Sequence, residues 1–438
     1  MMLTPFLTRL DTRAAIKGSR DPLAVQPIWS RLGRHVVGNL TTVSNSVADF
    51  SVLLLGYHFA QCLADQGGGE GDVATFLKWE QLCGYARHSR NRERGFRGTE
   101  RVSQRLAASN RVELGTHVDG QILSNQKTYG LWGLYTVAAK ASGLLEGDPT
   151  RLTAAGRTLV DKSLLPTLGA SGQRAQQDII ERLRKPTCTI DVGERGKDAA
   201  LLDNIATVIR EIRPTERRVY RDHLLHGGPG DADLVRGTRG RQRIFAELLA
   251  KTVDDDEWRL TPKTLQAVIR EAQKHTAGQE LAERLTRIRA TESVLAPAVA
   301  FFEHLLGCDG QSPTHVADKV RTQWGKGLSR TIDVAAVESL ETELHQNDAD
   351  SGRRWVQLAH ALHDADYEMA IRLTLEQNAA VMKARGASAP WADISDHKVH
   401  VRYRDEQVDR LPEAEQLPSY WRHAYFVDSL RSVTRSLQ

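Results

Sequence analysis

Over most of the second half of the chain, apolar residues recur at helical spacing and charged residues lie between them. Six segments combine spaced apolar residues with charged faces, which is the pattern of helices with one buried face. These predicted helices span residues 201–212, 241–252, 261–274, 280–306, 334–344 and 352–385. A period of two, typical of strands, is clearest at 187–192 and 398–403. The pattern predicts a mainly α, multi-helical fold with a few short strands.

The most apolar stretch of the chain runs from residue 50 to residue 64. It contains His58, is flanked by Asp49 and Asp65, and is shorter than the roughly 20 residues that an α-helix needs to cross a bilayer. Asp49 is expected to cap the N-terminus of a helix here. We therefore predict a buried core helix and no membrane partner. Another helix is predicted at 73–85.

A further helix with one buried face is predicted where Leu131, Leu134, Tyr135 and Ala138 follow the helical stripe. Gly143 stands at the expected C-terminal cap of this helix, where a left-handed backbone favours glycine.

A two-stranded hairpin is predicted directly after this glycine. Residues 144–145 and 151–152 would form the strands, and Gly-Asp-Pro-Thr at 147–150 would form the turn. Thr153 is expected to cap the next helix, which runs through Leu165.

The order of helix, glycine, apolar pair, short turn and Leu-Thr-Ala-Ala-Gly-Arg at 152–157 resembles the wing and exit helix of bacterial winged-helix domains. This resemblance covers under a tenth of the chain and implies a winged-helix-like subdomain near residues 100–165. The layout of the N-terminal half is similar to that of uncharacterised bacterial proteins found beside helicases and nucleases in phage-defence gene neighbourhoods. This second resemblance implies a recognition subunit of a bacterial multi-protein complex in antiviral defence.

A chain of 438 residues is longer than one hydrophobic core usually becomes, so several domains are expected. The four cysteines lie far apart, without the close pairs of a zinc site, so we expect reduced thiols and a cytoplasmic location. Changes in composition suggest an N-terminal helical region at 1–86, a basic and winged-helix-like subdomain at 87–165, a helical connector at 166–228 and a C-terminal helical domain at 229–438.

Positive charge is concentrated in one stretch of the chain. The formal net charge is +4 overall, yet residues 87–111 carry eight arginines against Glu93 and Glu100, a local balance of +6. Cations on phosphates supply most of the affinity for DNA, so this stretch beside a winged helix predicts a DNA-binding surface. The predicted contact residues are Arg90, Arg92, Arg94, Arg97, Lys127, Thr128, Tyr129, Lys140 and Arg151.

A protein-docking scaffold without nucleic-acid binding is one alternative, because winged helices also serve as docking modules. Gly130 and Gly133 favour it, since each glycine weakens a helix by about 1 kcal/mol and is unusual in a helix that enters a DNA groove.

A divergent metal-dependent nuclease is the other alternative. His360, His363 and Asp364 share one helical face by their spacing and are followed by Asp366, so imidazole and carboxylate groups could hold a divalent ion. The apolar stripe of the same segment leaves them near the solvent-facing side. The sequence contains neither a phosphate-binding glycine loop nor a serine-hydrolase elbow, so we predict a non-catalytic protein without a cofactor.

Overall fold

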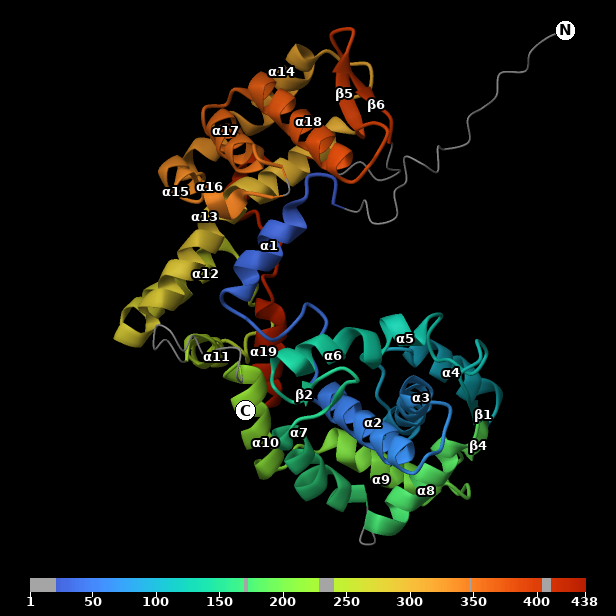
Figure 1. Cartoon of the computed structure of the whole chain (residues 1–438). Helices are drawn as coiled ribbons and strands as arrows, with labels where there is room; N and C mark the ends of the chain where they lie inside the picture. Colours follow the sequence, from blue (N-terminus) through green and yellow to red (C-terminus); the bar gives the residue numbers. More distant parts are fainter. Residues whose placement is uncertain (1–20, 169–171, 228–239, 347, 404–410) are drawn as a thin grey trace, which may run out of the picture. The chain divides into compact units, whose positions relative to one another are not determined.

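A computed structural model of the chain has helices as its main elements, with a few short strands, which confirms the predicted mainly α class (Figure 1). The chain divides into two compact units. Unit 1 contains Met1–Val36 and Glu257–Tyr425, and unit 2 contains Val37–Asp256 and Phe426–Gln438. The described residues are 21–168, 172–227, 240–346, 348–403 and 411–438.

The predicted domain boundaries relate to these units in different ways. Those at 86–87 and 165–166 both fall within unit 2, and the one at 228–229 lies outside the described residues.

Unit 2 is built around two long helices that pack against each other, α2 (Val47–Asp65) and α3 (Asp72–Arg90). The indole of Trp79 on α3 donates a hydrogen bond to the carbonyl of Val52 on α2 over 2.8 Å. The other elements of unit 2 are α4 (Thr99–Ala108), β1 (Arg111–Leu114), α5 (Gln126–Tyr129), α6 (Leu131–Ala141), β2 (Leu145–Glu146), β3 (Arg151–Leu152), α7 (Ala154–Leu159), η1 (Val160–Leu164), η2 (Leu165–Leu168), α8 (Gly172–Arg184), β4 (Cys188–Asp191), α9 (Ala199–Arg210), α10 (Pro214–Tyr220), η3 (Arg221–Leu225), α11 (Arg241–Ala250) and α19 (Val427–Ser436).

Helix α2 confirms the buried core helix predicted at 50–64. Among the described residues it is the one helix long and apolar enough to cross a membrane, and 72% of its apolar window is buried inside the structure. Its N-terminal cap is Ser46, whose side chain accepts a hydrogen bond from the N–H of Asp49. The prediction that Asp49 caps this helix was therefore wrong, because its carboxylate turns inward to an ion pair described below.

The helix and hairpin predicted around Gly143 are present. Gly143 follows the end of α6 with φ of 70°, the left-handed conformation expected there. Strands β2 and β3 pair antiparallel, with Leu145 opposite Leu152. Thr153 caps α7, because its hydroxyl accepts a hydrogen bond from the N–H of Gly156 over 3.1 Å. These local elements match their predictions, whereas the winged-helix-like subdomain near residues 100–165 remains a prediction.

The described strands form three separate antiparallel pairs. Strand β4 confirms the strand predicted at 187–192, and its partner is β1, with Val112 opposite Ile190 and both buried. Strands β5 (Ala392–Ser395) and β6 (Lys398–Val401) form a hairpin in unit 1.

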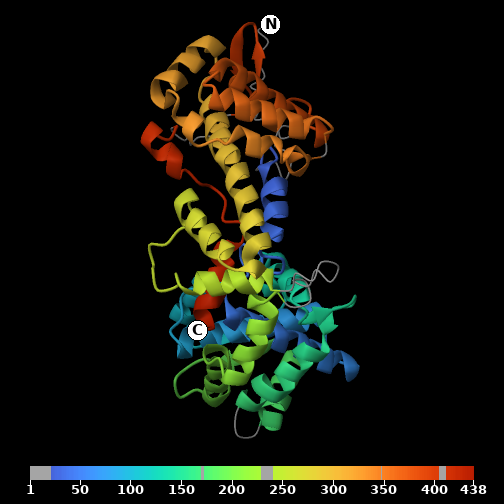
Figure 2. The ribbon, with the colours of Figure 1, turned by 90° about the vertical axis from the view of Figure 1, so that its left-hand side faces the viewer.

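Unit 1 centres on the long helix α13 (Gln279–Leu305), and α1 (Val25–Arg34) packs against it (Figure 2). The segment predicted as one helix at 352–385 is two helices, because Ala365 between them takes φ of 59°. The other elements are α12 (Pro262–Gln273), η5 (Thr276–Gly278), α14 (Pro313–Trp324), η6 (Gly327–Arg330), α15 (Val334–Glu338), α16 (Glu341–Leu344), α17 (Ser351–His363), α18 (Tyr367–Ala384) and η7 (Ala414–Ser419).

Candidate nucleic-acid interface

Arg87, the first arginine of the basic stretch, is a core residue. Its side chain is 6% exposed, and its Nη1 lies 2.5 Å from Oδ1 of Asp49. A second carboxylate, that of Glu93, accepts from its Nε over 2.8 Å and from its Nη2 over 2.5 Å. Burial alone would lower the pKa of Arg87, but the two carboxylates hold this pKa above its usual value. Arg87 therefore joins α3 to α2 and is not available to a ligand.

Arg90 and Arg105 also point into unit 2. Nε of Arg90 lies 3.1 Å from Oδ1 of Asp203, its Nη2 donates to the carbonyl of Gly193, and its side chain is 10% exposed. Arg105 donates to the hydroxyl of Tyr85 and to neighbouring backbone carbonyls. Several arginines of this +6 stretch thus form ion pairs and hydrogen bonds within unit 2. Arg90 is therefore poorly placed for the phosphate contact predicted for it.

Arg92, Arg94 and Arg97 lie nearer the surface, in the segment between α3 and α4. Arg92 and Arg94 are exposed and Arg97 is half-buried. Arg94 contacts the imidazole of His88 and lies 3.4 Å from the hydroxyl of Ser103. None of the three arginines forms an ion pair with a carboxylate of a described residue. Their charge is therefore available at the surface.

A buried polar network fixes the junction between α5 and α6 beside these arginines. Glu80 accepts hydrogen bonds from the N–H of Leu131 over 2.7 Å and from the amide of Gln126 over 2.8 Å. Burial raises the pKa of Glu80 to about 7, and these hydrogen bonds and the charge of Arg97 offset part of that shift. A Cβ on Gly130 would stand 2.4 Å from the carbonyl oxygen of Gln126, so this position requires glycine.

Sequence reasoning missed Glu80 and Gln126 because a glutamate within the amphipathic pattern of α3 looks like a solvent-facing residue. Gly130 was the available signal in the sequence. Its presence near the start of a helix is explained by the short distance between its backbone and the carbonyl oxygen of Gln126.

The network positions Lys127, Thr128 and Tyr129 on α5, where all three are exposed. Tyr129 is 56% exposed, so much of its side chain is open to solvent. Lys140 and Arg151 lie at the other end of α6, about 16 Å along its axis. There Nζ of Lys140 donates to the carbonyl of Gly147 over 2.8 Å. The predicted contact residues therefore form two groups, one at each end of α6.

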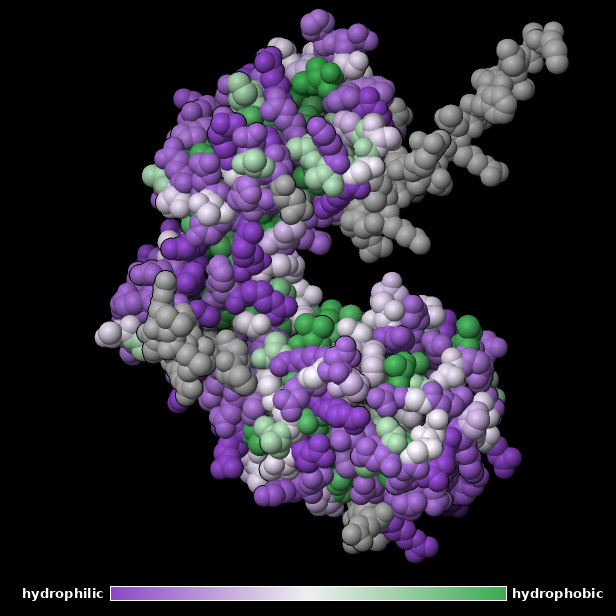
Figure 3. Space-filling model, in the orientation of Figure 1, coloured by the Kyte–Doolittle hydropathy of each residue, from purple (hydrophilic) through white to green (hydrophobic). Residues whose placement is uncertain are grey.

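The exposed face of α6 carries little that could read a base. Its exposed positions are Gly133, Val137 and Lys140, and Val137 is 63% exposed. The hydroxyl of Thr136 donates to the carbonyl of Trp132. The indole of Trp132 in turn stacks on Tyr57 with ring centroids 4.9 Å apart. Figure 3 shows similar small apolar patches among polar side chains on the face in view.

The residues proposed for a metal site do not converge on one point. His360 pairs with Glu338 over 2.8 Å, and His363 pairs with its neighbour Asp364 over 2.8 Å. The carboxylate of Asp366 instead caps α18 by accepting from the N–H of Met369. Among the described residues, no group of three or more His, Cys, Asp or Glu side chains is arranged to hold a metal ion.

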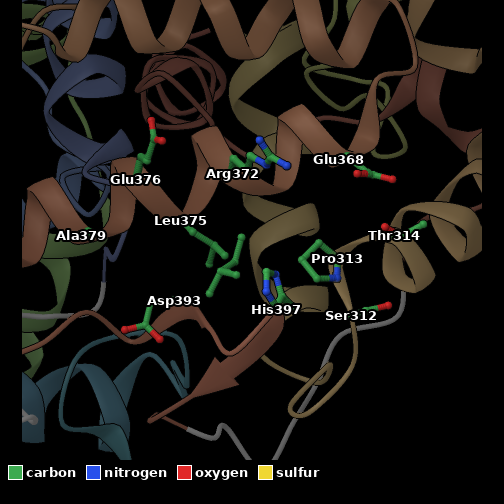
Figure 4. A pocket seen from close by; sticks show the side chains of 11 residues that line it. Ser312, Pro313, Thr314, Glu368, Arg372, Leu375, Glu376, Ala379, Asp393 and His397 are labelled. Carbon is green, nitrogen blue, oxygen red and sulfur yellow. The ribbon is translucent and has the colours of Figure 1, made fainter.

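A cavity of about 550 Å³ in unit 1 lies between α18, the start of α14 and the β5–β6 hairpin. Figure 4 shows Leu375 reaching into it, with the carboxylates of Glu376 and Asp393 on opposite sides. Leu375 makes its centre apolar, and the carboxylates of Glu376 and Asp393 stand apart from each other.

No protein family, curated protein or solved structure matches this chain.

Proposed function

We propose that unit 2 binds nucleic acid through phosphate contacts with Arg92, Arg94, Arg97 and Lys127, as the recognition part of a non-catalytic subunit. One observation carries this proposal. These four cations lie near the surface without a carboxylate partner among the described residues, whereas Arg87, in the same stretch, is buried between carboxylates. Lys140 and Arg151, at the far end of α6, would extend the contact along the backbone.

Binding of this kind depends little on base sequence. Direct readout in the major groove needs hydrogen-bonding side chains on the inserted helix, and α6 presents Gly133 and Val137. The exposed ring of Tyr129 offers a face for stacking, which tolerates any base. The setting in a cytoplasmic phage-defence complex rests on the resemblance of the sequence alone.

The salt dependence of binding tests this proposal. Each neutralised phosphate on duplex DNA contributes about −0.9 to the slope of log affinity against log salt, so four contacts predict roughly −3.6 and six predict roughly −5. Replacing Arg92 and Arg94 by glutamate should weaken DNA binding in a low-salt gel shift and reduce that slope by about 2.

The matched control is Arg218→Glu, which makes the same charge change at an exposed position of α10 in unit 2. It should leave binding nearly unchanged. Absence of any shift at low salt, or equal weakening by both changes, would remove the nucleic-acid proposal.

A protein-docking function is favoured by one specific observation, the exposed apolar pair Tyr129 and Val137. If a partner chain covers α6, Val137→Glu should abolish stoichiometric co-purification of that chain and leave DNA binding in place. Manganese-dependent cleavage of DNA that is lost in His363→Ala would instead support the nuclease alternative.

A further inference from the structure

Unit 1 holds another cavity, of about 260 Å³, lined by α1, the loop before α17, the first turn of α17 and the C-terminal half of α18. Three arginines line it: Arg31 in α1, Arg354 in α17 and Arg385 directly after α18. Asp348 is the one carboxylate among the lining residues, and His345 adds a further basic side chain. Positive charge therefore exceeds negative charge on the walls.

Arg354 is held in place by its neighbours. Its Nε donates to the side-chain oxygen of Gln377 over 3.0 Å, its Nη2 pairs with Asp348, and its side chain is 14% exposed. Gln377 is fixed in turn, since its amide donates to the carbonyl of Leu23 over 3.0 Å. This guanidinium is pre-organised at the cavity wall.

The other two arginines have hydrogen-bonding capacity that remains unused. Arg31 donates through Nη2 to the carbonyl of His345 over 2.8 Å, but its buried Nε has no acceptor among the described residues. Arg385 has a buried Nη1 that likewise lacks an acceptor in the described part of the chain. Buried donors in native proteins are rarely left without a partner.

The carboxylate of Asp21 does not accept a hydrogen bond from Arg385. Oδ2 of Asp21 stands 3.9 Å from Nη2 of Arg385, which is beyond hydrogen-bond distance. Asp21 already accepts from the N–H groups of Val25 and Gln26 at the start of α1, each over 2.9 Å. The described residues thus leave these two donors, Nε of Arg31 and Nη1 of Arg385, without an acceptor oxygen.

We propose that this cavity binds a small phosphate monoester, with its phosphate oxygens accepting hydrogen bonds from Arg31, Arg354 and Arg385. A guanidinium matches phosphate oxygens in a two-bond fork, and several such forks can surround a tetrahedral group. Ala24 and Val381 give the walls an apolar part that suits the organic half of such an ester. The volume lies just below the range of drug-sized pockets, so the ligand is small. This site belongs to unit 1 and is independent of the nucleic-acid proposal for unit 2.

Calorimetric titration of the full chain with phenyl phosphate, inorganic phosphate and benzoate tests the ligand class. We expect one phenyl phosphate per chain, weaker binding of inorganic phosphate because it lacks the organic half, and at least tenfold weaker binding of benzoate. Benzoate binding as tight as that of phenyl phosphate would overturn the phosphate assignment. Absence of binding of either phosphate compound at millimolar concentration would overturn the site.

Two variants with opposite expected effects test the residues. Arg385→Gln should weaken phenyl phosphate binding at least tenfold. Arg353→Gln is the matched control, because it removes a 62% exposed arginine on α17 that pairs with Asp350 and does not line the cavity. It should change the affinity less than twofold, and equal weakening by both changes would refute the proposal.

Asp348→Asn should tighten binding several-fold, because it removes the negative charge that competes for Arg354. Misfolding cannot tighten the binding of phenyl phosphate, so Asp348→Asn still tests the proposal if Arg385→Gln fails to fold. Unchanged or weaker binding in Asp348→Asn would overturn the proposal.

Discussion

Replacing Arg87 by methionine should destabilise unit 2 strongly, although the residue belongs to the stretch that the sequence marks as a binding surface. The change leaves the carboxylate of Asp49, which is 8% exposed, with the hydroxyl of Tyr135 at 3.0 Å as its remaining side-chain donor. The side chain of Glu93 is 34% exposed, so water can replace its lost contacts with Arg87. Removing one partner of a buried ion pair costs about 3–5 kcal/mol. For a unit of this size that loss lowers Tm by roughly 6–20 °C.

Urea denaturation followed by circular dichroism measures the loss, and hydrogen exchange read by mass spectrometry assigns it to α2 and α3. Arg94→Met is the control, since this exposed arginine should change the free energy of unfolding by less than about 0.5 kcal/mol. The double variant Arg87→Met with Asp49→Leu should be more stable than Arg87→Met alone, because no buried charge is then left without its partner. A loss below about 1 kcal/mol in Arg87→Met, or a double variant less stable than the single one, would refute this account.

Two further predictions concern the buried polar network of Glu80 and Gln126 at the junction between α5 and α6. Burial raises the pKa of Glu80 from 4.5 to about 7, so between these pH values the folded protein holds a proton that the unfolded chain releases. The free energy of unfolding should therefore fall as pH rises through this window, on the order of 1 kcal/mol per unit, and urea denaturation of Glu80→Gln should show a flatter dependence. An identical pH profile in the two proteins would contradict this. Gly130→Ala should cost about 1–3 kcal/mol, because the added methyl group collides with the carbonyl oxygen of Gln126; an unchanged thermal midpoint would show that α6 can shift.

Local chemistry made part of unit 2 predictable. Gly143 and Thr153 each determine the backbone of the few residues around them. Gly143 takes a left-handed conformation after α6, and Thr153 caps the first turn of α7. The alternation at 187–192 likewise reports the environment of its own side chains. Such features depend on neighbours in sequence, so a single chain without relatives is enough to find them.

Pairing between distant residues was not predictable. Nothing in the local pattern of Arg87 distinguishes it from Arg94, and the difference arises because Asp49, 38 residues before Arg87, pairs with Arg87 and not with Arg94 in the folded unit. Counting charges in a stretch therefore overstated the charge on the surface. The strand β1 was missed for the same reason, since its partner β4 lies far along the chain and neither strand is stable alone.

The division of the chain between its two units has a consequence for synthesis on the ribosome. Unit 2 begins at Val37 and receives its final helix, α19, only at residues 427–436, after the whole second segment of unit 1 has been made. Leu430 and Val433 of α19 are buried, and Arg435 donates to the carbonyl of Val253 over 2.8 Å. The surface of α11 that packs against α19 therefore stays uncovered in the nascent chain while about 170 further residues are made, which takes roughly 10–35 s at about 5–20 residues per second. During that interval the apolar side chains that α19 covers are accessible to chaperones, and cutting the chain before residue 426 would leave them uncovered permanently.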